Sequence, residues 1–527
     1  MKLRRIKLND NFRSLRSGFE LYFSPDSSKG EFNPYCVVGR NGSGKSNILE
    51  LLGAIFYSLE LRCLNFIPAI YEELDLANQS PNAYELEYTI DNALITIVKE
   101  ASSLATITKD GNTLQSQQEL KAALPHSVIG YSSGENEILS LPFFKMRFIQ
   151  YDEYLSYLTN DINYSAPESG LVYLDDTFSQ AIFLCNFIFS DEEAVSIFKN
   201  DLKIESVKQF RIIIKKHHLE EMSEEYQNSA DDHDQTELTT GLKKQIDKLI
   251  SCSTLHYDDE QAQELILDFY LNDSSKEAFN FYFTDEESKP SALALFQLFQ
   301  NLILLNQYQY EQSLKDKIYQ SNSLYAKGRI STVPWEERIF KFKDFWIQKN
   351  DTKILSKSLS DGEHQFLHTI GLALLYKNTE SLFLLDEPET HFNPDWRAKY
   401  ISTLRKCFED TQNLPEILIT SHSPFIVSDS RRENVLIFKK DNDNEVSCER
   451  PDFNTFGASV SKITMKVFDK TDTIGDFAHS KLQAFRDRFD KGEDVETLIN
   501  EVETSLGDSM EKILFLKLLF DKQEECK

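Results

Sequence analysis

A glycine-rich segment that ends in lysine and serine is the part of the sequence best suited to hold a phosphate chain. It runs from Gly39 to Ser46, fits the pattern G-x-x-x-x-G-K-S, and lies between a short apolar run and a helix with one apolar face, expected over 48–56. Glycines let the backbone wrap around phosphates, whose charge is met by N–H groups at a helix N-terminus. We therefore predict an ATP site with Mg²⁺ bound by the Ser46 hydroxyl, Lys45 on the β- and γ-phosphates, and further contacts from Asn41, Gly42, Ser43, Gly44 and Asn47. The alternative is a glycine-rich turn that binds no nucleotide.

Two acidic residues follow an apolar run much later in the chain. The run 382–385 is typical of a buried strand, and it delivers Asp386 and Glu387 at its carboxyl end. Asp386 is suited to contact Mg²⁺, and Glu387 is suited to act as the base that polarises an attacking water. The alternative is a leucine-rich core strand that simply runs into a turn at Pro388.

Ser360 is expected to begin a helix, and its surroundings allow two interpretations. With Glu363 at the third helical position, it fits a capping box that only stabilises the helix. In the other interpretation, Ser360, Gly362 and Glu363 form a second cradle, for the γ-phosphate of a nucleotide held by another copy of the chain. We predict the second role, because the segment precedes Asp386 in the order that such a site requires.

His422 follows a further apolar run, 417–419, and is expected at the carboxyl edge of a strand. A histidine there can contact a γ-phosphate, whereas a lone histidine at such a place would more often be structural. Because the other three motifs occur in order, we predict the functional role.

The pattern of apolar residues around these motifs predicts an α/β fold. Alternation over 84–90 and 94–97 indicates an antiparallel β part beside a mixed sheet that carries the phosphate loop. Four parts are predicted: a first ATPase lobe over 1–150, a helical insertion over 151–335, a second lobe over 336–445 with an aromatic strand at 339–347, and a helical region over 446–527.

The composition is that of an acidic globular chain. A formal net charge of −28 argues against a phosphate-binding surface over the whole chain. The seven cysteines include no C-x-x-C pair, which fits reduced thiols. No run approaches the roughly 18 apolar residues that a membrane helix needs, and no secretory signal is recognised, so we expect a cytoplasmic protein without membrane contact.

The four motifs, in this order, resemble the ABC-type ATPase heads of SMC proteins, RecF and the OLD-type ATPases. The segment 6–15 is similar to the first strand and the Asn-Phe-Arg-Ser segment of these heads, so the resemblance adds Arg13 to the nucleotide contacts. It implies that two copies pair head-to-tail, or form a higher oligomer, around two ATP molecules, with Ser360 and Gly362 acting in trans. It also implies a glutamine ligand of Mg²⁺ after the first lobe. Gln150 is one possible match, and the segment 131–137 could serve instead.

The sequence lacks several features of these families, which limits the kinds of ATPase that it resembles. The chain has no zinc-hook cysteines, no long coiled-coil pattern, and no Toprim-type acidic set after His422. The segments 131–137 and 386–391 are similar to the PtuA-type ATPases of Septu anti-phage systems, including those attached to retrons. This resemblance implies a sensor or scaffold that controls a partner HNH nuclease of the PtuB type, with a retron reverse transcriptase and its msDNA as further partners in some systems. A RecF-like DNA-repair ATPase and an OLD-like nuclease ATPase are the alternatives.

Overall fold

A seven-stranded sheet forms the centre of the protein. The computed structural model describes the chain except for residues 24–31, 69–75, 135, 160–166, 190–191, 217–239, 286, 322–332, 410, 412–413, 471–473 and 526–527. All neighbouring strands in the central sheet are parallel except β18, which is antiparallel to β17. In order across the sheet, the strands are β18 (Val446–Glu449), β17 (Val435–Lys440), β3 (Tyr35–Gly39), β16 (Glu416–Ser421), β15 (Leu382–Asp386), β8 (Val128–Ser132) and β9 (Leu171–Tyr173).

The register of the parallel strands gathers the motifs at one edge of this sheet. Strands β3, β15 and β16 are buried along their whole length, which is why they appear in the sequence as continuous apolar runs. Asp386 lies opposite Thr420 on one side and Ser132 on the other. Polar groups that end parallel strands therefore meet at the carboxyl edge, where ligands of such sheets bind.

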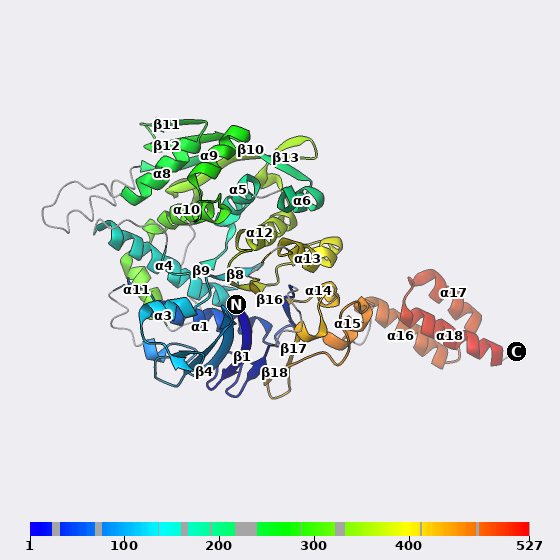
Figure 1. Cartoon of the computed structure of the whole chain (residues 1–527). Helices are drawn as coiled ribbons and strands as arrows, with labels where there is room; N and C mark the ends of the chain where they lie inside the picture. The colour runs from blue at the N-terminus through cyan, green and yellow to red at the C-terminus, as the bar shows by residue number, and fades with distance from the viewer. Residues whose placement is uncertain are drawn as a thin grey trace.

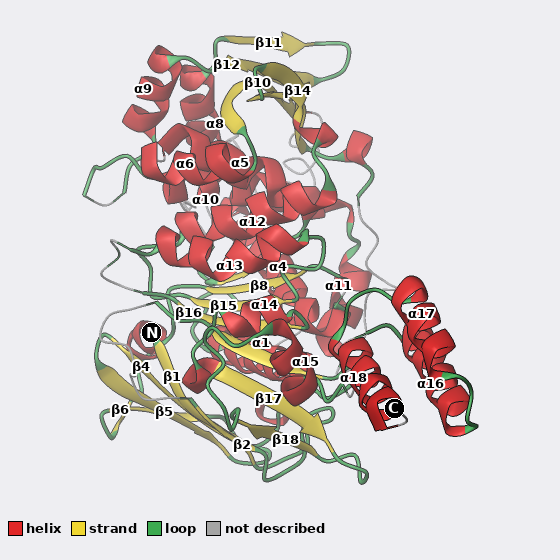
Figure 2. Ribbon diagram, turned by 90° about the vertical axis from the view of Figure 1, so that its right-hand side faces the viewer, coloured by secondary structure: helices red, strands yellow, loops and turns green. Residues whose placement is uncertain are grey.

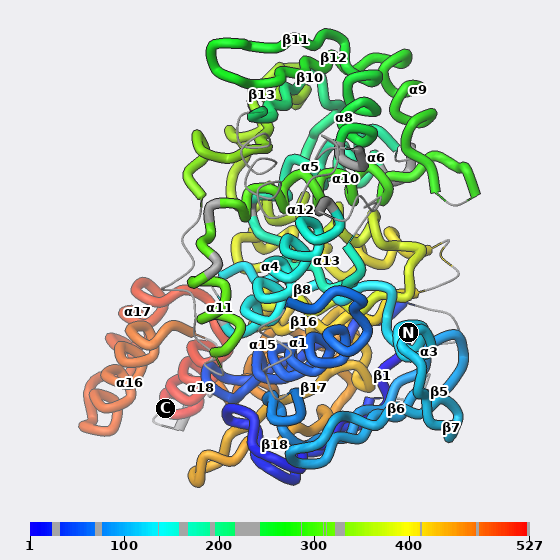
Figure 3. The backbone as a smooth tube through the Cα atoms, turned by 90° about the vertical axis from the view of Figure 1, so that its left-hand side faces the viewer, coloured from blue at the N-terminus to red at the C-terminus, as the bar shows by residue number. Residues whose placement is uncertain are grey.

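A second, antiparallel sheet packs on one side of the central sheet. Helix α1 (Lys45–Leu61) shares one apolar core with both sheets, together with part of α4 (Glu137–Thr159). Figure 3 shows α1 close to both sheets, with β5 and β6 on the outside. The antiparallel sheet has the order β2 (Glu20–Tyr22), β1 (Lys2–Leu8), β4 (Tyr84–Ile90), β5 (Ala93–Lys99), β6 (Thr106–Lys109) and β7 (Asn112–Thr113), and α3 (Gln117–Ala123) follows it.

Helices cover the other face of the central sheet and form a second core (Figure 2). Helices α12 and α5 pack closely at Gly371, where an added Cβ would lie 2.6 Å from Cγ2 of Ile182. The helices on this side are α5 (Ser179–Phe189), α6 (Glu192–Asp201), α10 (Ala292–Leu304), α12 (Asp361–Leu375), α13 (Pro394–Cys407) and α14 (Pro424–Ser428).

The insertion contains a five-stranded antiparallel sheet as well as helices, which the sequence did not reveal. Its strands are β11 (Leu255–Asp259), β12 (Glu264–Tyr270), β10 (Ile204–Lys215), β13 (Phe340–Lys349) and β14 (Thr352–Leu355), and its further helices are α8 (Thr240–Cys252), α9 (Asp273–Tyr282) and α11 (Gln312–Gln320). Register shifts between β10 and β13 break the two-residue alternation that marks a strand. The aromatic strand predicted near 339–347 is β13, and it pairs with β10 and β14 of the insertion.

The C-terminal helices α16 (Asp476–Asp490), α17 (Val495–Ser505) and α18 (Met510–Glu525) form a small unit with a core of its own. Figure 1 shows this unit to one side of the body, reached through α15 (Val460–Val467). In the described part of the chain, no helix is both long and apolar enough to span a bilayer. The predicted fold class is confirmed: a mixed sheet with a phosphate loop, flanking helices, an antiparallel β part and a helical C-terminal region. The predicted helical insertion has its helices, and it carries the five-stranded sheet in addition.

Candidate functional site

The loop between β3 and α1 has a backbone that only glycine adopts easily. Gly39 has a φ of +147°, and a Cβ there would lie 2.3 Å from the carbonyl oxygen of Phe438 on the neighbouring strand β17. Gly44, at the N-cap of α1, has a φ of +90°, and its Cβ would lie 2.8 Å from the Ser14 hydroxyl. The loop therefore closes tightly over the N-terminus of α1, whose first N–H groups favour an anion.

Lys45, the first residue of α1, is buried within this loop. Its Nζ donates a hydrogen bond to the carbonyl oxygen of Arg40, 3.1 Å away. Burial lowers the pKa of Lys45, while the charges of Glu387 and Asp386 act in the opposite direction. A buried ammonium held by one carbonyl can gain most from an incoming anion, because its desolvation is already in place.

Asp386 is the point where the motifs join. Its Oδ1 accepts hydrogen bonds from the Ser46 hydroxyl at 2.9 Å and from the Thr420 hydroxyl at 2.6 Å. Its Oδ2 accepts one from the side-chain amide of Asn136 at 2.8 Å. The hydroxyl and carboxylate oxygens of Ser46 and Asp386 are the hard donors that Mg²⁺ prefers, so these residues fit the predicted ion.

Gln150, predicted as a metal ligand, does not reach this site. It lies in α4, and its Nε2 donates to the backbone carbonyl of Ser169 at 3.3 Å. Asn136, just before the start of α4, is the amide that contacts Asp386. It belongs to the segment 131–137, the second of the two predicted matches, so the Gln150 assignment is corrected. Helix α4 carries Gln150 away from the carboxyl edge of the sheet, because each residue advances a helix by about 1.5 Å.

Glu387 and His422 face each other across the end of the strands. Oε1 of Glu387 lies 3.3 Å from Nε2 of His422. The hydrogen bond with His422 is the main cause that lowers the pKa of Glu387, so the carboxylate is ionised and can accept a proton. Glu387 has a φ of +50°, in the left-handed region, and its N–H is held by the hydroxyl of Thr420 at 3.0 Å. A non-glycine residue in this region is strained, which is frequent at functional sites.

Arg13 lies beside the phosphate loop. It also has a positive φ, of 56°, and its Nε is 3.8 Å from Oε2 of Glu50, a buried carboxyl in α1. Burial raises the pKa of Glu50, and the charge of Arg13 opposes this. Asn47 hydrogen-bonds with the hydroxyl of Ser14, the residue after Arg13. The segment that the resemblance singled out is therefore tied to the first turn of α1.

Most of the predicted residues line one open cleft of about 990 Å³. Asn41 and His422 line another hollow with Phe468, and Ser43 is a buried residue of the loop. The sequence did not assign four further residues to the site: Ser14, Glu50, Asn136 and Thr420. Two of them lie in segments that the resemblance had named, Ser14 in 6–15 and Asn136 in 131–137. The cleft is lined by Arg13, Ser14, Gly42, Gly44, Lys45, Ser46, Asn47, Glu50, Ser132, Ser133, Gly134, Asn136, Ile138, Asp386, Glu387, Thr390 and His391.

The segment around Ser360 lies outside this cleft. Ser360 caps α12, its backbone N–H donates to Oε2 of Glu363 at 2.9 Å, and the capping box is complete. Glu363 also pairs with Lys349. Gly362 is packed so that a Cβ would lie 2.6 Å from the carbonyl oxygen of His391, in the loop that follows Glu387. The exposed helix N-terminus is thus fixed to the same loop that follows Glu387.

Three comparisons with known proteins bear on this site. A family model described as an AAA ATPase domain matches residues 1–427. Protein ea59 of Escherichia phage lambda is 24% identical over 169 residues, which is 32% of this chain and 30% of that protein. The Retron Ec83 probable ATPase of Escherichia coli is 25% identical over 154 residues, 25% of this chain and 28% of that protein. The chain therefore spans less than a third of the length of these two relatives.

Solved structures give only a distant likeness. An SMC head domain from Thermotoga maritima has a TM-score of 0.33 and 10% identity, covering 86% of this chain and 100% of that one. A structure of the recombination mediator protein RecF has a TM-score of 0.29 and 14% identity, covering 85% and 97%. Scores this low do not define a fold, so the architecture rests on the sheets and helices described above.

A buried carboxyl next to the site predicts how stability depends on pH. Burial raises the pKa of Glu389 to about 7, with a hydrogen bond from Ser421 opposing the shift. Because this pKa lies above the usual 4.5, Glu389 favours folding fully below about pH 4.5, and that contribution is lost as the pH rises to about 7. Glu389→Gln should therefore flatten the fall in stability between pH 5 and 8, by about 1–3 kcal/mol. Denaturant unfolding at several pH values, without nucleotide or Mg²⁺, measures this. The exposed Glu409→Gln is the control, and equal pH profiles for Glu389→Gln and wild type would contradict the prediction.

Proposed function

We propose that this chain, which belongs to the AAA ATPase domain family, binds ATP and Mg²⁺ in the cleft at Lys45 and Asp386 and hydrolyses the ATP to ADP and phosphate. The observation that carries the proposal is the 2.9 Å hydrogen bond from Ser46 to Asp386. It joins the phosphate loop to the acidic end of β15, two segments that are far apart in the sequence. A hydroxyl and a carboxylate at this spacing can share one Mg²⁺, which would neutralise phosphate charge and orient the nucleotide.

The groups around Asp386 divide the work of binding and hydrolysis. The N–H groups of the loop and the ammonium of Lys45 meet the negative charge of the phosphates. The ionised Glu387 accepts a proton from the attacking water as it approaches the γ-phosphate. His422, 3.3 Å from Glu387, orients that carboxylate and is within reach of the γ-phosphate. Asn136 holds Asp386 in place by its hydrogen bond to Oδ2.

Two copies of the chain pair head-to-tail in this proposal. Ser360 and the N-terminus of α12 are exposed and line no part of the cleft of their own chain. A helix N-terminus that is capped by its own side chains and still faces solvent can meet a phosphate from a second copy. Since Gly362 packs on the carbonyl of His391, docking at α12 would also act on the loop that follows Glu387. ATP binding would thereby close the dimer, and hydrolysis would open it.

The proposed role of this cycle is to restrain and release a separate nuclease in anti-phage defence. The similarity to the Retron Ec83 probable ATPase supports a defence setting, although it covers only 28% of that protein. The partner would be a cytoplasmic HNH nuclease of the PtuB type, and in retron-linked systems a reverse transcriptase with its msDNA would join the assembly. The net charge of −28 favours a protein partner over direct DNA binding by this chain.

Two substitutions separate nucleotide binding from hydrolysis. Lys45→Ala should weaken ATP binding about 10- to 100-fold, because charged hydrogen bonds to phosphate contribute about 1.5–3 kcal/mol. Glu387→Gln should keep binding but lower kcat by about 10²–10⁴-fold, since the site loses its base. Calorimetry with ATP and phosphate-release kinetics measure the two effects, and Glu409→Gln is the surface control. The ATPase proposal fails if Glu387→Gln neither retains ATP nor self-associates more strongly with ATP and Mg²⁺.

Mixing of inactive variants tests the head-to-tail pairing. Ser360→Arg should block the phosphate cradle that acts in trans, and Lys45→Ala the site that acts in cis, so each variant alone is inactive. Mixed together, they should regain part of the activity, because one of the two composite sites then has both Lys45 and Ser360. Lys45→Ala mixed with Glu387→Gln is the matched control and should stay inactive, since both lesions lie in the cis half. Activity of Ser360→Arg alone near the wild-type rate would exclude the trans role.

Purification of the chain with its neighbouring gene products tests the defence role. We expect a short HNH protein to co-purify, and its nuclease activity to change when ATP is added or when the chain carries Glu387→Gln. The alternatives predict different results for the isolated chain. A RecF-like ATPase would bind DNA in a strongly salt-dependent way. An OLD-like nuclease would cleave DNA with a metal ion even after Lys45→Ala.

A further inference from the structure

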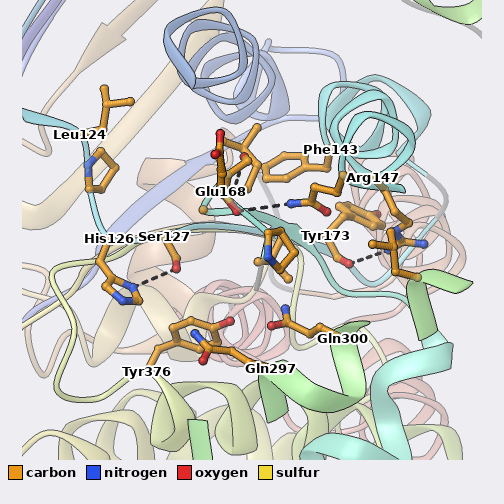
Figure 4. A pocket seen from close by; sticks show the side chains of 18 of the residues that line it. Leu124, His126, Ser127, Phe143, Arg147, Glu168, Tyr173, Gln297, Gln300 and Tyr376 are labelled. Atoms are coloured by element: carbon orange, nitrogen blue, oxygen red, sulfur yellow. Dashed lines mark hydrogen bonds between the residues drawn. The ribbon is translucent and has the colours of Figure 1, made fainter. Parts of the chain in front are cut away.

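Figure 4 shows a second cavity, of about 320 Å³. Its lining includes the residues that precede β8 and β9, at the opposite end of these strands from the carboxyl edge with the predicted nucleotide residues. It shares no lining residue with the nucleotide cleft. Its walls come from the ends of β8 and β9, from α4 and α10, and from Tyr376, the C-cap residue of α12. The cavity therefore sits where the edge of the central sheet meets helices of the insertion. Gln150, the residue that the sequence assigned to the metal, is one of its lining residues.

The cationic side chains in the wall already have acidic partners. Nζ of Lys121 lies 2.6 Å from Oε2 of Glu60, a carboxyl that is almost completely buried. The guanidinium of Arg147 lies 2.8 Å from Oδ2 of Asp175 and also donates to the backbone carbonyl of Tyr173. Since each positive charge is matched at short distance, the wall offers little net attraction for a phosphate or a carboxylate.

The acidic side chain in the wall is also occupied. Glu168 accepts hydrogen bonds from the backbone and side-chain N–H groups of Asn65, both at 2.6 Å, and from the hydroxyl of Tyr157 at 2.8 Å. A cation would have to compete with these three donors. A charged ligand of either sign is therefore disfavoured, and the chemistry left to the cavity is that of uncharged groups.

Carboxamides and aromatic rings form much of the remaining wall, together with His126, Ser127 and Ser169. Gln297 and Gln300 project from α10, and Figure 4 shows them with Tyr376 on one side of the cavity, opposite Glu168 and Phe143. The Gln150 side chain is fixed by a hydrogen bond from its Nε2 to the backbone carbonyl of Ser169. Carboxamides both donate and accept hydrogen bonds, and the rings of Phe143, Tyr173 and Tyr376 supply flat apolar surface.

We propose that this cavity binds a neutral, planar heterocycle of nucleobase or nucleoside size, and that its occupancy changes the rate of ATP hydrolysis. Amide groups at the edge of a base and aromatic side chains against its face are the contacts by which proteins hold an extruded nucleobase. The volume lies at the lower end of the range for small-molecule sites, which suits one base or nucleoside and excludes a strand of nucleic acid.

Two helices connect the cavity to the proposed ATPase site, and this step rests on that proposal. Helix α4 starts beside Asn136, which bonds Asp386, and reaches the cavity at Phe143, Arg147 and Gln150, up to roughly 20 Å along its axis. Helix α12 starts at Ser360 and ends at Tyr376 in the cavity wall. An occupant that shifts either helix end therefore acts on a group that touches the nucleotide or the second copy.

Binding is tested first with the nucleotide cleft disabled. Adenosine, guanosine, cytidine and uridine are titrated one at a time into the full chain carrying Lys45→Ala, and heat of binding is recorded. We expect one of them to bind, and Gln297→Ala together with Gln300→Ala to weaken its binding at least about tenfold. Gln297→Trp should abolish binding by filling the cavity, while the exposed control Gln261→Trp should leave it unchanged. Melting curves show whether each variant is folded. If Gln297→Trp does not fold, Gln300→Ala alone is used in its place, and it should weaken binding of the nucleoside.

Several outcomes would contradict the proposal that this cavity binds a nucleoside. These are no heat with any of the four nucleosides, equal binding by Gln297→Trp and Gln261→Trp, or binding of inorganic phosphate in preference to a nucleoside. Because Lys45→Ala is used throughout, these results do not depend on ATP hydrolysis by the chain, and a failed ATPase assay leaves them intact.

Coupling is then tested in the chain with Lys45 intact. The nucleoside that binds should change kcat about fivefold or more at saturating ATP, which is the lower range of allosteric coupling. Competition at the nucleotide cleft would instead raise KM and leave kcat unchanged. The effect should disappear in Gln297→Trp and persist in Gln261→Trp. An unchanged kcat at saturating nucleoside overturns the coupling.

Discussion

The hydrogen bonds to Asp386 are the interaction on which the rest of the site depends. This one carboxylate is held by Ser46 from α1, by Thr420 from β16 and by Asn136 from the start of α4. Each of these residues lies near the end of a different helix or strand. The parallel strands bring these ends together at the carboxyl edge of the central sheet. Because Asp386 is buried, an unpaired carboxylate would be costly there, so the hydroxyl and amide donors stabilise it.

The same hydrogen bonds also support the strained backbone of Glu387. Glu387 follows Asp386 directly and adopts a left-handed backbone conformation that aims its carboxylate at His422. Its N–H is fixed by Thr420, which also contacts Asp386. The strained backbone at Glu387 is therefore supported by Thr420, which also holds Asp386, so the positions of the two carboxylates depend on each other.

Helices α12 and α4 connect this edge to a distant part of the fold. Helix α12 presents Ser360 to solvent at one end and reaches the amide-lined cavity at the other, and α4 links Asn136 to that same cavity. Helix α10 of the insertion lines this cavity, and it shares a core with α5. In the proposed coupling, a ligand in that cavity would act on the carboxyl edge through these helices.

The sequence by itself determined the phosphate loop, the acidic strand end and the apolar strands between them. These features depend on local chemistry: only glycine accepts the backbone at Gly39 and Gly44, and a fully buried parallel strand must be apolar on both faces. Only the tertiary structure decided that Asn136, rather than Gln150, reaches Asp386, because this depends on which end of α4 faces the strand ends. It also decided that the strand predicted near 339–347 joins the insertion's sheet, since strand pairing is a long-range choice and irregular register hides the alternation that would reveal it.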